Sequence, residues 1–102
     1  MMTVEDIRER ISPVCAKYGI RQAYLFGSYA RGEATEKSDV DIRIEKGVNK
    51  NLETLLQVSG FRLKLEDALQ KKVDLITLLP QQSLYDIFRN KVLKEEILLY
   101  EG

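Results

Sequence analysis

Charged and apolar residues alternate strictly in the stretch DVDIRI, Asp39 to Ile44. A period of two is typical of a β-strand, because successive side chains point to opposite faces of the sheet. One face of this strand must therefore be buried in a core, while the other face carries Asp39, Asp41 and Arg43. The sequence predicts a sheet whose second face displays two closely spaced carboxylates.

A helix is expected before this strand, over residues 3–18, because apolar side chains recur there at helical spacing. Thr3 can cap it, with Asp6 at the capping-box position. Pro13 removes one backbone donor, so the helix should be kinked there or divided into two pieces. Gly19 is a natural stop.

The remaining elements complete a small α/β layer. They are a buried strand over 20–26, a long leucine-rich helix that Asn51 caps and that runs to Leu69, a strand over 72–78, a helix that Ser83 caps, and the segment 97–100, which either ends that helix or forms an edge strand. The order of helices and strands predicts an α/β (α+β) fold, a small mixed β-sheet flanked by helices.

Length and composition limit the class of protein. A chain of 102 residues fits one domain, here residues 1–102, and 44% hydrophobic with 31% charged residues is a globular composition. Sixteen basic and sixteen acidic residues cancel, so neither nucleic acid nor a membrane is attracted by overall charge. No run of roughly 18 apolar residues and no signal-peptide pattern is present, and a cytoplasmic location is expected.

The chain contains no histidine, and Cys15 is its only cysteine. Ser-His-Asp and Cys-His catalysis and His-ligated zinc are therefore excluded, as are an internal disulfide and a CxxC metal site. Any chemistry must come from carboxylates, hydroxyls, Lys, Arg and Tyr.

The carboxylates form the first candidate site. Asp39 and Asp41 leave the same strand face and repel each other unless a cation lies between them. Mg²⁺ prefers such oxygen ligands and completes its shell with waters and substrate phosphates. Asp74 adds a third carboxylate if its strand lies beside residues 39–44. Three carboxylates could hold two ions about 4 Å apart, the arrangement that serves phosphoryl or nucleotidyl transfer.

The turn after the first strand forms the second candidate site. Gly27 permits a tight turn and close backbone approach, and Ser28 can begin a short helix whose free N–H groups favour an anion. Arg31 can add positive charge from the same turn. Alone, a Gly-Ser turn or a DxD pair is usually structural or solvated, and neither GxxxxGK[ST] nor GxGxxG is present. The combination in this order raises the expectation of a nucleotide site.

The string GSYARGEATEKSDVDIRI resembles the signature of the DNA polymerase β-like nucleotidyltransferase superfamily. In that signature Gly-Ser is followed by ten residues and Asp-x-Asp, as Gly27-Ser28 and Asp39-Val40-Asp41 are here. The pattern is more similar still to the minimal nucleotidyltransferases, the MNT domains, and the similarity extends over most of the chain. The resemblance implies the nucleotidyltransferase fold.

The resemblance also implies roles for the residues of both sites. Gly27 and Ser28 would contact the phosphates of ATP, Asp39 and Asp41 would bind Mg²⁺, and Asp74 would be the third carboxylate, which deprotonates or positions the acceptor hydroxyl. MNT proteins are commonly paired with HEPN-domain toxins. The expected function is thus an antitoxin that transfers AMP from ATP to a tyrosine of its toxin.

Other interpretations stay open. One is an aminoglycoside-type nucleotidyltransferase acting on a small molecule, and another is a non-catalytic antitoxin that acts by binding alone. Arg43 departs from the family, in which an apolar residue is usual, and is expected to pair with Asp41 or to reach a phosphate. The surplus of apolar residues in Leu52–Leu69 and in the closing segment ILLYEG predicts a surface that docks a protein partner in a hetero-oligomer.

Overall fold

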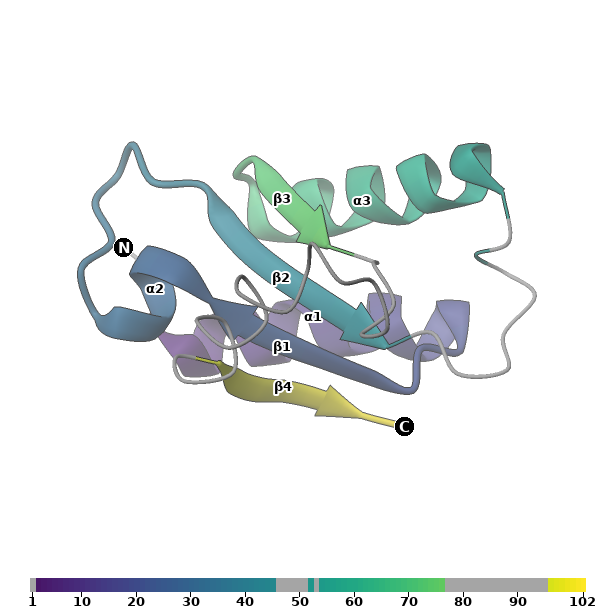
Figure 1. The fold of residues 1–102 in the computed structure, drawn as a ribbon, viewed down its shortest axis with the longest axis horizontal. Helices are drawn as coiled ribbons and strands as arrows, with labels where there is room; N and C mark the ends of the chain where they lie inside the picture. The colour runs from purple at the N-terminus through teal and green to yellow at the C-terminus, as the bar shows by residue number, and fades with distance from the viewer. Residues whose placement is uncertain (1, 46–51, 53, 77–95) are drawn as a thin grey trace, which may run out of the picture.

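The computed structural model describes residues 2–45, 52, 54–76 and 96–102 of the chain. Figure 1 shows the helices and strands within them. In chain order they are α1 (Val4–Tyr18), β1 (Gln22–Phe26), α2 (Gly27–Arg31), β2 (Val40–Glu45), α3 (Leu55–Leu69), β3 (Val73–Ile76) and β4 (Ile97–Glu101).

The four strands form one mixed sheet in the order β3-β2-β1-β4. β1 is antiparallel to both of its neighbours, β2 and β4, whereas β2 and β3 are parallel. A parallel pair needs a long crossover, and α3 provides it between β2 and β3. The predicted small mixed sheet flanked by helices is confirmed.

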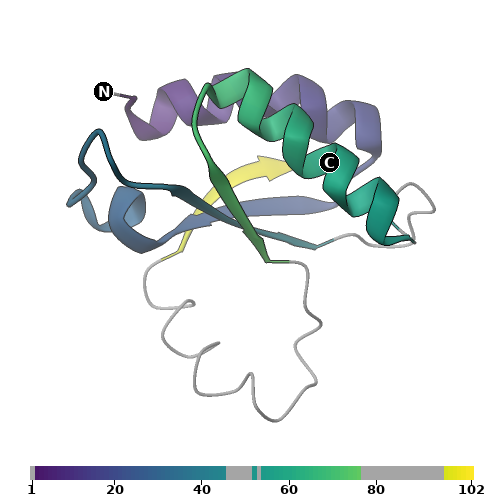
Figure 2. The same cartoon turned by 90° about the horizontal axis from the view of Figure 1, so that it is seen from above.

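Helices α1 and α3 cover the same face of the sheet, as Figure 2 shows from above. The core lies between them and the strands. Its fully or almost fully buried members include Ile7, Ile11 and Cys15 of α1, Phe61, Leu65 and Leu69 of α3, Ala23 and Leu25 of β1, and Val40, Ile42 and Ile44 of β2. Because the buried apolar residues of β2 alternate with Asp41, Arg43 and Glu45, the other face of this strand carries charge.

α1 begins and ends as the sequence predicts. Thr3 and Asp6 make both hydrogen bonds of a capping box, and Gly19 ends the helix in the left-handed region. Pro13 lies inside one continuous helix, so its division into two pieces is wrong. The buried side chains of Ile11 and Cys15 flank the proline, and their packing holds both sides in one helix.

α3 begins later than the sequence predicts. Its N-cap is Thr54, which forms a capping box with Gln57, and not Asn51, which lies outside the described residues. Leu55 and Leu56, in the first turn of α3, are 88% and 83% exposed. The buried residues of α3 are Phe61, Leu65 and Leu69, so burial starts only with the second turn of the helix.

The closing segment forms the edge strand β4, so this alternative is confirmed and a helical ending is wrong. β1 starts at Gln22 rather than Ile20, and the helix expected after Ser83 lies outside the described residues. Within the described ranges, no helix is long and apolar enough to cross a membrane.

Candidate functional site

The register of the sheet brings two of the predicted carboxylates together. Asp41 of β2 is the direct partner of Asp74 of β3 in the parallel ladder. Partner residues in a ladder point to the same face, here the one that α1 and α3 leave uncovered. The condition for a third carboxylate, that the strand of Asp74 lies beside that of Asp41, is met.

The Gly-Ser turn lies directly against the same carboxylate. On the other side of β2, Asp41 is the partner of Phe26, so Gly27 follows at the level of Asp41. Gly27 has φ +73°, and a Cβ atom there would overlap Oδ2 of Asp41 and lie 3.0 Å from its Cγ. Glycine is thus required both by backbone conformation and by the contact with Asp41.

Helix α2 places backbone donors at this end of the sheet. Its N-cap, Phe26, has no side-chain atom that can accept a hydrogen bond, so no side chain caps the first turn there. Ser28 is half-buried in that turn, and the buried ring of Tyr29 anchors the helix. First-turn N–H groups that lack a side-chain cap are suited to a phosphate.

Arg31 ends α2 close to the carboxylates. Its Nε pairs with Oε2 of Glu33 at 3.0 Å, and its charge lowers the pKa of Asp41. The structure therefore places Gly27, Ser28 and Arg31 on one short turn beside Asp41.

The carboxylates oppose one another's ionisation. Burial, then the charges of Asp74 and Asp39, then a hydrogen bond with Asp74, raise the pKa of Asp41 from its ordinary 3.8 to about 6; Arg31 acts in the opposite direction. The exposed Asp39 precedes β2, on which Asp41 is half-buried. The charges of Asp39 and Asp74 therefore both repel the ionised carboxylate of Asp41. Without a cation, a proton on Asp41 relieves this repulsion, and a bound cation would do the same.

The donor set fits Mg²⁺ in part. No three His, Cys, Asp or Glu side chains in the described part of the chain form a group that could hold a metal ion by themselves. Mg²⁺ is usually held by one or two carboxylates together with waters and substrate phosphates, so a complete protein cage is not required. Asp39, Asp41 and Asp74, with a phosphate-sized turn at Gly27, have the chemistry of such a shared site.

Arg43 does not join this site. Its Nε and Nη2 donate to the two carboxylate oxygens of Glu96 at 3.0 and 3.1 Å, and its Nη1 donates to Glu45 at 3.2 Å. The guanidinium also lies over the ring of Tyr24, 4.5 Å from the centroid. The expected pairing with Asp41 is wrong, and Glu96, 53 residues away in sequence, was not foreseen.

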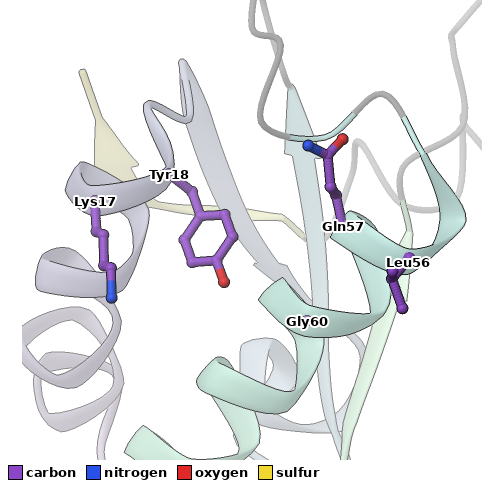
Figure 3. Close-up of a pocket in the computed structure, with 5 residues that line it drawn as sticks. All are labelled: Lys17, Tyr18, Leu56, Gln57 and Gly60. Carbon is purple, nitrogen blue, oxygen red and sulfur yellow. The ribbon is translucent and has the colours of Figure 1, made fainter.

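A groove of about 390 Å³ lies between the end of α1 and the first turns of α3 (Figure 3). It is lined by Lys17, Tyr18, Leu56, Gln57 and Gly60. These residues include no carboxylate, and α2 lies at the opposite end of the molecule from the start of α3 (Figure 1). Leu55, Leu56 and Leu63 of α3 are exposed, and the groove is separate from the aspartates.

Comparison with known proteins agrees with this geometry. Residues 9–102 match the family model described as polymerase beta, nucleotidyltransferase. A Methanocaldococcus jannaschii protein, provisionally named a protein adenylyltransferase, is 35% identical over 96 residues, which are 94% of this chain and 97% of that protein. Protein adenylyltransferase MntA of Thermococcus cleftensis is 33% identical over 101 residues, 95% of this chain and 96% of its own.

Solved structures share the fold. One, provisionally described as a minimal nucleotidyltransferase, has a TM-score of 0.68 and 36% identity over 94% of this chain and 95% of its own. A toxin–antitoxin with AMP-PNP has a TM-score of 0.73 and 23% identity, over 93% and 73% of the two chains. The complex of a tri-AMPylated Shewanella oneidensis HEPN toxin with its MNT antitoxin has a TM-score of 0.65 and 20% identity, over 94% and 71%. At these identities the last two show likeness of fold alone.

Proposed function

The chain belongs to the polymerase β nucleotidyltransferase family, and we propose that it is the antitoxin of a HEPN-domain toxin and transfers AMP from ATP to a tyrosine of that toxin. The observation that carries the proposal is the contact of the Gly27 turn with Asp41, which is itself paired with Asp74. A phosphate-binding turn and a carboxylate pair in contact are the two halves of a nucleotidyl-transfer site.

Three similarities support the substrate and the partner. Full-length relatives are named protein adenylyltransferases. One structure of the same fold is a toxin–antitoxin with AMP-PNP, an ATP analogue. Another is a complex whose HEPN toxin carries AMP groups. A cytoplasmic hetero-oligomer with the toxin follows as part of the proposal, without direct contact to nucleic acid or membrane.

In the proposed reaction, the tyrosine oxygen of the toxin attacks the α-phosphorus of ATP, the bond to the β-phosphate breaks, and pyrophosphate leaves. Gly27, Ser28 and Arg31 hold the phosphates through N–H groups, a hydroxyl and a guanidinium. Mg²⁺, as one or two ions held with Asp39 and Asp41, supplies neutralisation of the phosphate charge when bound.

Asp74 serves the acceptor side of the site. It is exposed, and it belongs to β3, an edge strand, where a tyrosine of another protein can approach. Asp41, by contrast, is half-buried and in contact with the phosphate-binding turn. Asp74 therefore accepts the phenolic proton or orients the phenol, which brings the nucleophile and the α-phosphorus together.

The test is the intact mass of the partner toxin after incubation with this protein, ATP and Mg²⁺. The proposal predicts a mass increase of one or more whole adenylyl groups, located on tyrosine by fragmentation. Asp41→Asn should abolish the increase. Asp67→Asn, an equal change at an exposed residue of α3, should leave it unchanged. No adenylyl group on the toxin under any of these conditions would contradict the proposal.

The two alternatives give different results in the same assay. A small-molecule nucleotidyltransferase would modify an aminoglycoside and leave the toxin unmodified. If the protein acts by binding alone, its Asp41→Asn variant would neutralise the toxin as well as the wild type does. The exposed Leu55, Leu56 and Leu63 favour a protein partner over a small molecule, because apolar side chains clustered on one surface mark docking sites.

A further inference from the structure

Arg43 lies where it could disable the metal site. It leaves the same face of β2 as Asp41, two residues further along, which separates the two Cα atoms by about 7 Å. An arginine side chain spans that distance, and a bidentate arginine–carboxylate pair is among the stronger polar contacts in proteins. A guanidinium free to move would therefore compete with a cation for the carboxylate of Asp41.

Glu96 and Glu45 engage all three nitrogens of that guanidinium. Nε and Nη2 donate to Glu96 at 3.0 and 3.1 Å, and Nη1 donates to Glu45 at 3.2 Å. The side chains of Arg43 and Glu96 are only 9% and 12% exposed. Solvent therefore screens this ion pair weakly. Removal of the Glu96 charge would leave the buried guanidinium only partly paired, which favours a contact with another carboxylate.

Glu96 pulls the guanidinium sideways across the sheet, from β2 toward β4. The guanidinium lies over the ring of Tyr24, which belongs to β1, and Glu96 immediately precedes β4 on the far side of β1. Asp41 and Asp74 pair across β2 and β3, on the opposite side of β1. The cation is thus drawn across β1 toward one edge of the sheet, while the carboxylate pair lies toward the other edge.

We propose that Glu96 is a positioning residue of the metal site, which holds the Arg43 guanidinium away from Asp41 so that this carboxylate can bind Mg²⁺ together with Asp39. The inference rests on the proposed function, because that function places Mg²⁺ at the aspartates. Glu96 touches neither substrate nor metal in this account and acts only through Arg43. Without the Glu96 carboxylate, Arg43 keeps its hydrogen bond to Glu45. Its Nε and Nη2 groups are then free to donate to the carboxylate of Asp41.

The first test measures Mg²⁺ binding to the purified protein by calorimetry in the presence of AMP-PNP. Glu96→Gln keeps the shape of the side chain and removes its charge, and it should weaken Mg²⁺ binding by about tenfold, the equivalent of one charge-assisted hydrogen bond. Glu101→Gln is the matched control, because Glu101 is an exposed glutamate of β4. It should bind Mg²⁺ as the wild type does.

The second test separates positioning from support of the fold. The double variant Arg43→Gln/Glu96→Gln lacks both the Arg43 guanidinium and the Glu96 carboxylate that holds it. Its Mg²⁺ affinity should therefore return to within about twofold of the wild-type value. Arg43→Gln alone should bind Mg²⁺ at least as tightly as the wild type, and it keeps the question answerable if Glu96→Gln does not fold.

Three outcomes would overturn the inference: wild-type Mg²⁺ affinity in Glu96→Gln, an affinity in the double variant as weak as in Glu96→Gln, or weakened binding in Arg43→Gln. Each leaves the proposed function standing if the wild type still adenylylates its partner. A wild type that binds neither Mg²⁺ nor AMP-PNP and transfers nothing would overturn both.

Discussion

Asp41 and Arg43 lie two residues apart on one face of β2, but the protein balances their charges differently. Burial alone would lower the pKa of Arg43, yet the charge and hydrogen bonds of Glu96, with those of Glu45, raise it above its ordinary value. For Asp41, burial and the charges of Asp74 and Asp39 all raise the pKa, to about 6. Glu96 and Glu45 stabilise the charged form of Arg43, whereas Asp74 and Asp39 destabilise the charged form of Asp41. A bound cation would stabilise the charged form of Asp41.

The comparison is broken most severely by Asp41→Asn, which removes the carboxylate whose ionisation burial, Asp74 and Asp39 oppose. We expect transfer to fall by about a thousandfold or more, because a primary metal ligand is lost where charge develops in the transition state. Asp39→Asn should also abolish transfer. The assay is the initial rate of toxin adenylylation, with circular dichroism to show an intact fold and Asp67→Asn as control. Transfer at the wild-type rate by either variant would end the assignment of the pair to metal binding.

Asp74→Asn sharpens the comparison by dividing the carboxylates between two roles. We expect transfer to fall by roughly a hundredfold, the usual effect of losing a general base. Binding of AMP-PNP with Mg²⁺ should survive in part, since Asp41 and the Gly27 turn remain. Calorimetric titration decides the point: if affinity falls as far as in Asp41→Asn, Asp74 is a primary ligand instead.

Two glycines provide a matched test of the contact between the turn and Asp41. Gly27 and Gly32 have φ +73° and +74°, but a Cβ atom at Gly27 meets Asp41, whereas one at Gly32 meets nothing within 4 Å. Gly32→Ala should cost about 1 kcal/mol of unfolding free energy, from left-handed strain alone. Gly27→Ala should cost about 3 kcal/mol, because overlap is added. Equal losses in urea denaturation would show that the turn does not rest on Asp41.

The smallest expected effect concerns stability and pH without Mg²⁺. Folding raises the pKa of Asp41 from 3.8 to about 6. The ionised carboxylate therefore lowers the free energy of unfolding fully above pH 6, and this loss disappears below pH 4, where the group is protonated in both states. Asp41→Asn removes the penalty, so this variant should be more stable than the wild type at pH 8, by about 1 kcal/mol after solvent screening. The gain should vanish near pH 4. Urea denaturation at both pH values checks this, and a gain that is independent of pH would refute it.

Local patterns predicted the strand and the shared face of its aspartates, because the cause is local. The alternation from Asp39 to Ile44 places the aspartates on one face whatever the rest of the chain does. The overlap between Gly27 and Asp41 follows from the antiparallel register of β1 and β2, which no local pattern determines.

The missed partner of Arg43 has a non-local cause. Glu96 binds Arg43 across 53 residues of chain, and only the completed sheet brings them together. The start of α3 was missed for a local reason, because the capping box of Thr54 with Gln57 begins the helix later than Asn51.

The pKa of Asp41 tests the central claim most directly, namely that this carboxylate is hard to ionise until a metal cation binds it. Its carboxyl carbon can be followed by NMR in ¹³C-labelled protein across a pH titration, assigned with Asp41→Asn. Without Mg²⁺ the account predicts a midpoint near pH 6, and with Mg²⁺ and AMP-PNP a midpoint that falls well below that value. A midpoint near the ordinary 3.8 without metal, or one that Mg²⁺ and AMP-PNP leave unchanged, would contradict it.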